Sequence, residues 1–227
     1  MQERTFFGLL FTLAVFGFVT DQASKYSVFG WLATVESNTY ALFQTEPESR
    51  FFAVVPAPAD PMARFAQRGF FLEVAFQPQS DPNAPLVPHV NHGALFGLGR
   101  EHTGLANLAF ALVSLTAAIG ILVWAFVWGG ARDRWLSAAL GLILGGCLGN
   151  LYDRLMFNGV RDFLHWNYLF DWPVFNIADC CLVVGAGMLL LQAFFAPQPQ
   201  SDNRDKASEE KSQPVSVGGI MKNGTTV

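Results

Sequence analysis

The chain has 227 residues, of which 52% are hydrophobic and 14% are charged, whereas about 25% of residues are charged in an average soluble domain. This composition excludes an ordinary soluble protein and predicts an integral membrane protein. The formal net charge of −4 comes from residues concentrated in loops and tail, and no basic block indicates a nucleic acid partner.

The first spanning helix is expected within residues 1–33. Its apolar run, residues 5–32, has 28 residues, and at about 1.5 Å each these exceed the hydrocarbon layer of about 30 Å. A cleaved signal peptide is the competing interpretation, but Asp21, Gln22 and Lys25 follow the apolar core without a small-residue cleavage pattern. Asp21 and Lys25 are four residues apart, so they share one helix face near the far end of the span.

Residues 34–102 are predicted to form an extramembrane region of strands and loops. Eight of the 12 Pro lie between positions 34 and 90, and no uninterrupted apolar run there is long enough to span a membrane. The segments FFAVV (51–55) and GFFLEVAF (69–76) are short, β-branched or aromatic, and bounded by Pro or Gly. Such segments are typical of strands in a small sheet, and residues 77–85 are expected to be a loop.

Residues 103–196 are predicted to contain three further spanning helices. Residues 103–131 carry no charge, residues 132–134 form a turn, and helices follow at 135–152 and 172–196. Small residues that allow close helix packing stand in the third span, namely Gly141, Gly145, Gly146 and Gly149.

The remaining tail, residues 197–227, is rich in Pro, Ser, Lys and Glu and is predicted to be a disordered cytoplasmic segment. The expected fold class is therefore an all-α integral membrane protein with four transmembrane helices and a small β-containing region on the outer face.

The basic residues orient the predicted spans. Arg4, the turn with Arg132 and Arg134, and the basic residues of the tail fall on one side, which the positive-inside rule assigns to the cytoplasm. Both termini are therefore expected in the cytoplasm. The same topology gathers residues from four separate parts of the chain near the outer face: Asp21, Asn91, residues 150–154 together with the nearby Asp162, and Asp179.

Carboxylates at or beside the spans require a function or a partner, because an ionisable group at the centre of a spanning helix costs about 2.5–3.5 kcal/mol on insertion scales. We predict that Asp162 and Asp179 form a pair. The alternatives are a solvated loop position for Asp162, a catalytic Asp153, and an ordinary charge pair between Asp153 and Arg154. Asp179 needs a partner inside the bundle, because it stands in the apolar run NIADCCLVVG.

Five short motifs follow one another along the predicted spans: DQASK (21–25), NHGALF (91–96), GGCLGNLYDR (145–154), VRDF (160–163) and FNIAD (175–179). In this order they resemble the motif set of bacterial lipoprotein signal peptidase, signal peptidase II. The resemblance covers most of residues 5–196. The segment between the first helix and Asn91 is longer than usual for the family, and the tail has no counterpart.

This resemblance implies an intramembrane aspartic endopeptidase of the bacterial inner (cytoplasmic) membrane that cuts prolipoproteins before a diacylglyceryl-modified cysteine. It implies catalytic roles for Asp162 and Asp179 near the outer, periplasmic face. The substrate-binding or supporting residues would be Asp21, Lys25, Asn91, Gly93, Asn150, Asp153, Arg154, Asn176 and Ala178. Helix packing or capping is an equally valid interpretation of Asn91, Asn150, Arg154 and Asn176.

The chain departs from the family pattern beside Asp162, where Arg161 stands in place of the more usual apolar residue. A cation directed at Asp162 would lower the pKa of that carboxyl. We therefore expect the Arg161 side chain to point away from Asp162.

The implied reaction explains why two carboxyl groups are needed. Two close carboxyls sharing one proton can activate a water and protonate the leaving nitrogen, since like charges about 3 Å apart do not both ionise readily. No cofactor is expected, and no metal, because His92 and His165 lack paired ligand spacing. The expected partners are lipid-modified prolipoproteins and membrane lipids, and the protein is expected to be a monomer.

Other functions would use the same residues differently. A small proton-coupled transporter would use Asp21, Asp153, Asp162 and Asp179 as a relay, which favours carboxylates distributed across the membrane depth. A catalytically inactive scaffold is the third possibility.

Overall fold

The structure is a computed structural model that describes residues 5–34, 48–56, 69–78, 84–93, 103–128, 130–167 and 170–195. The chain divides into two compact units, Met1–Phe194 and Phe195–Val227, and the fold below is that of the first unit. The predicted disorder of residues 197–227 lies outside the described residues.

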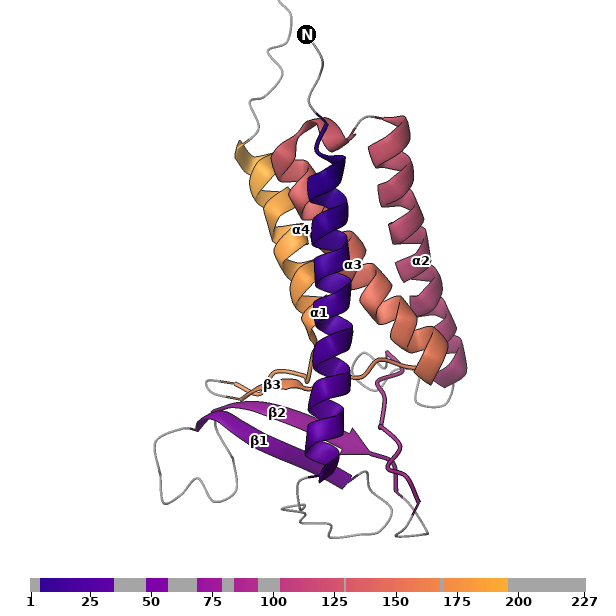
Figure 1. Ribbon diagram of the computed structural model, residues 1–227, viewed down its shortest axis with the longest axis vertical. Coiled ribbons are helices and arrows are strands. Elements are labelled where there is room, and N and C mark those ends of the chain that lie inside the picture. The colour runs from indigo at the N-terminus through magenta and orange to yellow at the C-terminus, as the bar shows by residue number, and fades with distance from the viewer. Residues whose placement is uncertain are drawn as a thin grey trace, which may run out of the picture. The chain divides into compact units, whose positions relative to one another are not determined.

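Four long helices make up most of the described chain (Figure 1). They are α1 (Phe7–Thr34), α2 (Thr103–Val127), α3 (Arg134–Phe157) and α4 (Ile177–Phe195), with the short 3-10 helix η4 (Gly130–Arg132) between α2 and α3. All four are long and apolar enough to cross a membrane. The four predicted spans are confirmed.

The ends of two helices differ from the predicted ones. Helix α3 continues to Phe157, beyond the predicted end at position 152, so Asp153 and Arg154 lie in its last two turns. Helix α4 begins at Ile177 rather than at position 172. The reason is that Phe175 is paired in extended conformation with Leu164, with backbone N to O distances of 2.8 and 2.9 Å.

Helix α3 lies at the centre of the bundle, and its glycines let the neighbouring helices approach closely. A Cβ atom added at Gly145 would lie 2.7 Å from the Ala14 backbone oxygen of α1, and one at Gly146 would lie 2.5 Å from the Ala178 oxygen of α4. Such contacts replace the hydrophobic driving force that helices lack in lipid. The predicted role of these glycines in close packing is confirmed.

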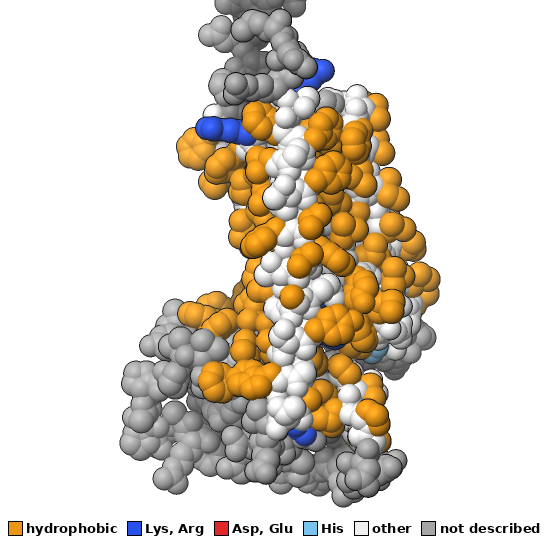
Figure 2. Space-filling view, viewed as in Figure 1, with side chains coloured by type: hydrophobic (Ala, Val, Ile, Leu, Met, Phe, Trp, Pro, Cys, Tyr) orange, Lys and Arg blue, Asp and Glu red, His pale blue; other side chains and the backbone are white. Residues whose placement is uncertain are grey.

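The outward faces of the helices are apolar. Leu105 of α2, Val183 of α4 and Phe194 of α4 are 69%, 71% and 75% exposed, and Figure 2 shows hydrophobic side chains along the whole length of the helices. The buried face of α2 carries the small residues Ala111, Ala118 and Ala125. An apolar exterior over a tightly packed interior suits a hydrocarbon environment.

A three-stranded antiparallel sheet lies at one end of the helices, in the order β1 (Glu48–Pro56), β2 (Gly69–Phe76) and β3 (Leu164–Asn167) (Figure 1). The first two strands contain the predicted segments. The third was not predicted, because its four residues lie within the aromatic connection between the third and fourth spans. In the register, Phe71 of β2 lies opposite His165 of β3.

The sheet is fixed to the end of α1 by a small apolar core. Its buried members are Phe29, Leu32, Val74, Phe76, Phe163 and Leu164. Because Phe163 and Leu164 are both anchored there, the backbone that carries Asp162 is held where the bundle meets the sheet.

Candidate active site

Asp179 is positioned by the first turn of α4. The Asn176 side chain accepts a hydrogen bond from the Asp179 backbone N at 3.0 Å, and the Asp179 carboxylate accepts one from the Asn176 backbone N at 3.2 Å. This reciprocal arrangement is a capping box, which fixes both side chains at the helix N-terminus. The positive end of the helix dipole favours a carboxylate there.

Asp162 lies on the connection between α3 and β3, and neighbouring backbone fixes that connection from two sides. Val160 and Asn91 exchange backbone hydrogen bonds of 2.7 and 2.8 Å. On the other side, Phe163 donates its backbone N–H to the Phe175 oxygen at 3.0 Å. The Asp162 side chain, half-buried between them, has little freedom to move.

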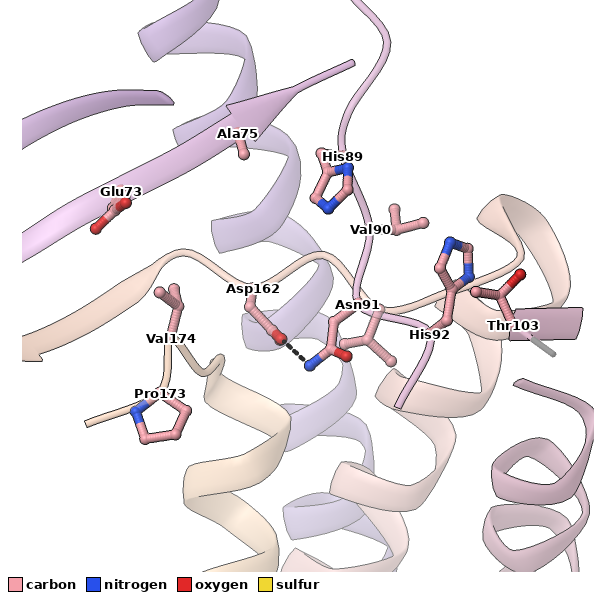
Figure 3. Close-up of a pocket in the computed structure, with 11 residues that line it drawn as sticks. Glu73, Ala75, His89, Val90, Asn91, His92, Thr103, Asp162, Pro173 and Val174 are labelled. Carbon is pink, nitrogen blue, oxygen red and sulfur yellow. Dashed lines mark hydrogen bonds between the residues drawn. The ribbon is translucent and has the colours of Figure 1, made fainter. Parts of the chain in front are cut away.

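Asparagine side chains join the two carboxyl groups. Asp162 accepts hydrogen bonds from Nδ2 of Asn91 at 3.0 Å and from Nδ2 of Asn176 at 2.6 Å, the first of which is drawn in Figure 3. Asn150 donates to Oδ1 of Asp179 at 2.8 Å and accepts from Asn176 at 3.2 Å. The structure therefore brings both predicted aspartates into one hydrogen-bond network, with Asn176 bonded to each.

The electrostatic environment of Asp162 disfavours its charged form. Burial, together with the charge of Asp179, raises the pKa of Asp162 to about 7, although hydrogen bonds from Asn91 and Asn176 act in the opposite direction. At neutral pH a large share of Asp162 side chains is therefore protonated.

Gly93 supports this geometry through Asn91. Its φ of 87° is in the left-handed region that favours glycine, and its backbone N donates to Oδ1 of Asn91 at 2.8 Å. With the amide oxygen held in this way, the Asn91 nitrogen is directed at Asp162.

Arg154 lies close to the network without binding either carboxylate among the described residues. Its Nη1 donates to the Asn150 backbone oxygen at 3.3 Å, and its guanidinium stacks 5.4 Å from the ring centre of Phe110. Its Nε is buried and has no hydrogen-bond partner in the described part of the chain. Arg154 thus retains a free donor near the two aspartates.

A second polar cluster lies behind the first, between α1, α3 and α4. Asp21 and Lys25 form an ion pair of 2.8 Å, and both are 0% exposed. Asp21 also accepts the Ala178 backbone N–H at 2.9 Å, which ties α1 to the first turn of α4. This buried cluster therefore joins α1 to the helix turn that carries Asp179.

Asp153 belongs to this buried cluster. Its carboxylate lies 3.3 Å from Nζ of Lys25 and 2.9 Å from Nη2 of Arg161. The alternative of an ordinary charge pair between Asp153 and Arg154 is therefore wrong. The side chain of Arg161 points away from Asp162, as expected, and binds Asp153 and Gln22 instead.

Two cavities flank the pair of aspartates. The first, of about 530 Å³, opens beside Asp162 and lies between β2 and the segment 89–92 (Figure 3). Its polar lining comes from Glu73, His89, Asn91, His92, Thr103 and Asp162. Part of the segment 91–96, which the sequence singled out, lies outside the described residues.

The second cavity, of about 550 Å³, opens beside Asp179 on the outer face of α4. Apart from Asp179, its lining is almost wholly apolar, with Trp172, Phe175, Cys180, Val183 and Val184 among its residues. Pro173 and Val174 line both cavities. The two aspartates thus lie between a polar opening and an apolar one.

Sequence reasoning missed the contribution of Gln22 and of the sheet residues Glu73 and His165. Gln22 donates to Asp21 at 3.0 Å and to Asp153 at 3.2 Å. A polar side chain in an apolar helix, next to Asp21, was the available signal. His165 binds Glu73 and Asp171 through its two ring nitrogens, and no local pattern predicts those pairings. Among the described residues, no group of three or more His, Cys, Asp or Glu side chains is arranged to hold a metal ion.

Fold and site together define a class of protein: a four-helix membrane protein with two aspartates joined by asparagines at one end of the bundle. The model of a family described as signal peptidase (SPase) II matches residues 13–195, and the chain belongs to that family. With four apolar helices, it is a multi-pass bacterial membrane protein.

Curated relatives named lipoprotein signal peptidase are similar to much of this chain. The relative from Rhodopirellula baltica is 48% identical over 118 residues, which is 46% of this chain and 51% of the relative. The relative from Methylorubrum extorquens is 39% identical over 127 residues, 56% of this chain and 72% of the relative. For Pseudomonas syringae the identity is 42%, over 46% of this chain and 61% of the relative. The chain thus spans about half to three-fifths of the length of the first and third of these relatives.

Two solved structures, both titled as a bacterial membrane enzyme studied by the in meso method, share the fold. One has a TM-score of 0.55 at 21% identity and covers 95% of this chain and 99% of the other. The second has a TM-score of 0.56 at 22% identity and covers 87% of this chain and 99% of the other.

Proposed function

We propose that this protein is an intramembrane aspartic endopeptidase that removes signal peptides from prolipoproteins by cutting before a diacylglyceryl-modified cysteine. One observation carries the proposal: Asp162 and Asp179 are both hydrogen-bonded to Asn176 and lie between a polar cavity and an apolar one. Membership of the signal peptidase II family and the similarity to proteins named lipoprotein signal peptidase support it.

The proposed chemistry uses the pair as a unit. One carboxylate takes a proton from the attacking water while the other, protonated, gives a proton to the leaving nitrogen. The raised pKa of Asp162, caused by burial and by the charge of Asp179, favours a pair that holds one proton near neutral pH. Because such titrations belong to the pair, no separate acid and base roles are assigned.

The two cavities suggest how a substrate would lie. The apolar cavity along α4, with Val183 and Val184 exposed on the outer helix face, suits the hydrophobic part of a substrate that arrives through the bilayer. The polar cavity beside Asp162 suits the peptide that follows the cleaved bond. In this arrangement the acyl chains remain in lipid.

The proposed topology places both termini in the cytoplasm and the aspartates near the outer face. Arg132 and Arg134 lie at the end of the bundle where α1 begins, since Phe6 donates its backbone N–H to the Ala131 oxygen at 2.6 Å. The positive-inside rule assigns that end to the cytoplasm. The sheet lies at the other end (Figure 1), and with it Asp162, just before β3, and Asp179, in the first turn of α4. A proton relay would favour carboxylates spread over the depth of the bundle, whereas Asp21, Asp153, Asp162 and Asp179 gather at this end.

The function is tested by incubating purified protein, in detergent or lipid, with a prolipoprotein in two forms. One form carries the diacylglyceryl group on cysteine, and the other lacks it. The expected result is cleavage of the lipidated form alone, with the modified cysteine as the new N-terminus by mass spectrometry. No cleavage of either form, or a cut elsewhere, contradicts the proposal.

A further inference from the structure

Arg161 is the largest fully buried side chain of the described protein, and it adjoins Asp162. It is 2% exposed. Its guanidinium carbon contacts the rings of Tyr26 and Phe157, at 4.3 and 4.0 Å from their centres. A buried cation is retained only with partners that replace its hydration, so this environment is built specifically around the side chain.

The polar partners of Arg161 come from two different helices. Nε and Nη2 bind the two carboxylate oxygens of Asp153 in α3, at 3.3 and 2.9 Å. Nη2 also donates to Oε1 of Gln22 in α1 at 2.9 Å. In addition, the Arg161 backbone N donates to Asp153 at 2.9 Å, so both the main chain and the side chain are fixed at the same carboxylate.

Arg161 and Lys25 together balance the charges of Asp153 and Asp21, because Lys25 lies 3.3 Å from Asp153 and 2.8 Å from Asp21. Any cation at position 161 would supply this charge. What Arg161 adds is a rigid, planar attachment of its own chain segment to α1 and α3, which a bidentate guanidinium provides and a lysine does not.

We propose that Arg161 is a positioning residue, which clamps the connection 160–162 to α1 and α3 so that the carboxyl of Asp162 stays directed at Asn91 and Asn176. The inference rests on the proposed function, in that the clamp serves the cleavage reaction. Arg161 is not among the residues that line the cavity beside Asp162, so the clamp acts on Asp162 through the backbone that the two residues share.

The test compares Arg161→Leu and Arg161→Lys with wild type, using the lipidated prolipoprotein and counting only folded protein. Arg161→Leu is expected to lower kcat by about 10- to 100-fold, the loss typical of a reacting group displaced by about 1 Å, with KM within about threefold because both cavities remain. Arg161→Lys keeps the charge and is expected to recover part of kcat.

The matched control is Arg50→Leu. It removes a cation bonded to the Leu32 and Ala33 oxygens and stacked on Phe76, and it is expected to retain kcat.

Hydrogen exchange supplies a readout that does not depend on activity. In Arg161→Leu, or in Arg161→Lys if the leucine variant does not fold, amides of residues 160–163 should exchange faster while those of α2 stay unchanged. The proposal is overturned if kcat per folded molecule stays within about twofold of wild type, if KM alone changes, or if exchange in 160–163 is unaltered. An inert wild type contradicts the proposed function, and the clamp is then judged by exchange alone.

Discussion

Asp162 is the residue of the site whose titration should be visible in the stability of the protein. Its pKa is raised from 3.8 to about 7, by burial first and by the charge of Asp179 second. A carboxyl whose pKa is raised on folding destabilises the folded state increasingly as pH rises from the unfolded to the folded pKa. The wild-type protein should therefore lose stability between about pH 4 and pH 7 through this group.

Replacing Asp162 with Asn removes that loss. We expect the Tm of Asp162→Asn, minus that of wild type, to increase from about pH 4 to pH 7 and then to level off. Thermal unfolding in detergent at several pH values measures it. In an Asp179→Asn background the increase should end at lower pH, because the neighbouring charge is gone. A Tm difference that is flat or decreases with pH would show that folding does not raise the pKa of Asp162.

His165 connects the sheet to the segment that precedes α4. It binds Glu73 of β2 and Asp171 through its two ring nitrogens. Burial lowers its pKa, but the hydrogen bond to Asp171 and the charge of Glu73 outweigh burial, so the pKa is raised. Stability from a histidine with a raised pKa is fully present below its unfolded pKa of about 6.5 and is lost as pH rises through the folded pKa.

Accordingly, the Tm lost in His165→Gln should be larger at pH 5.5 than at pH 8.5. His89 supplies a control of opposite sign, because burial and the nearby His92 lower its pKa. In His89→Gln, the Tm relative to wild type should increase as pH falls below about 6.5. Equal Tm losses for His165→Gln at both pH values would argue against a charged His165 between the two carboxylates.

At the scale of elements, helix packing depends on glycines that face a neighbouring helix. In Gly145→Ala the new Cβ would lie 2.7 Å from the backbone oxygen of Ala14, so one helix must move. We expect a loss of about 1–3 kcal/mol in the free energy of unfolding. Gly120 of α2 has nothing within 4 Å of its Cβ position, and Gly120→Ala should be neutral or gain up to about 1 kcal/mol. Denaturation in mixed micelles compares the two, and equal effects would contradict the packing argument.

The elements also show what sequence can and cannot predict. The four spans and strands β1 and β2 can be predicted from local apolar runs, without knowing which elements they pack against or pair with. The strand β3 has only four residues. It forms because Leu164 pairs with β2, which is distant in the sequence, and with Phe175, which follows after a turn. Because Phe175 is held in this pairing, α4 begins at Ile177 and not at the predicted position 172. Interactions between distant segments decide both features, so no local pattern contains them.

At the scale of the whole molecule, the site is assembled where three helices meet a sheet. Asp162 and Asp179 were predicted as a pair because carboxylates are costly in apolar spans, and the structure places both in the network around Asn176. The buried contact of Arg161 with Gln22 joins residues 139 positions apart. The sequence indicated only that Arg161 should avoid Asp162, because what a buried cation binds depends on how α1 packs against α3.

Buried charged residues outside the pair of aspartates connect the segments that carry the pair. Asp21 holds α4 through the Ala178 backbone N–H, while Asp153 holds the Asp162 connection through the Arg161 backbone N–H. Lys25 lies between these two carboxylates at 2.8 and 3.3 Å. The buried cluster therefore links the segment that carries Asp162 to the helix turn that carries Asp179.

The most direct test of the account is the turnover of lipidated prolipoprotein by Asp162→Asn, Asp179→Asn and the double variant. Asp133→Asn serves as control, because Asp133 caps the opposite end of α3 and Asn caps helices about as well. Two residues that act as one unit should give single variants that bind substrate but do not cut, and a double variant no worse than either. Near-wild-type turnover in either single variant would contradict the assignment of Asp162 and Asp179 as the catalytic pair.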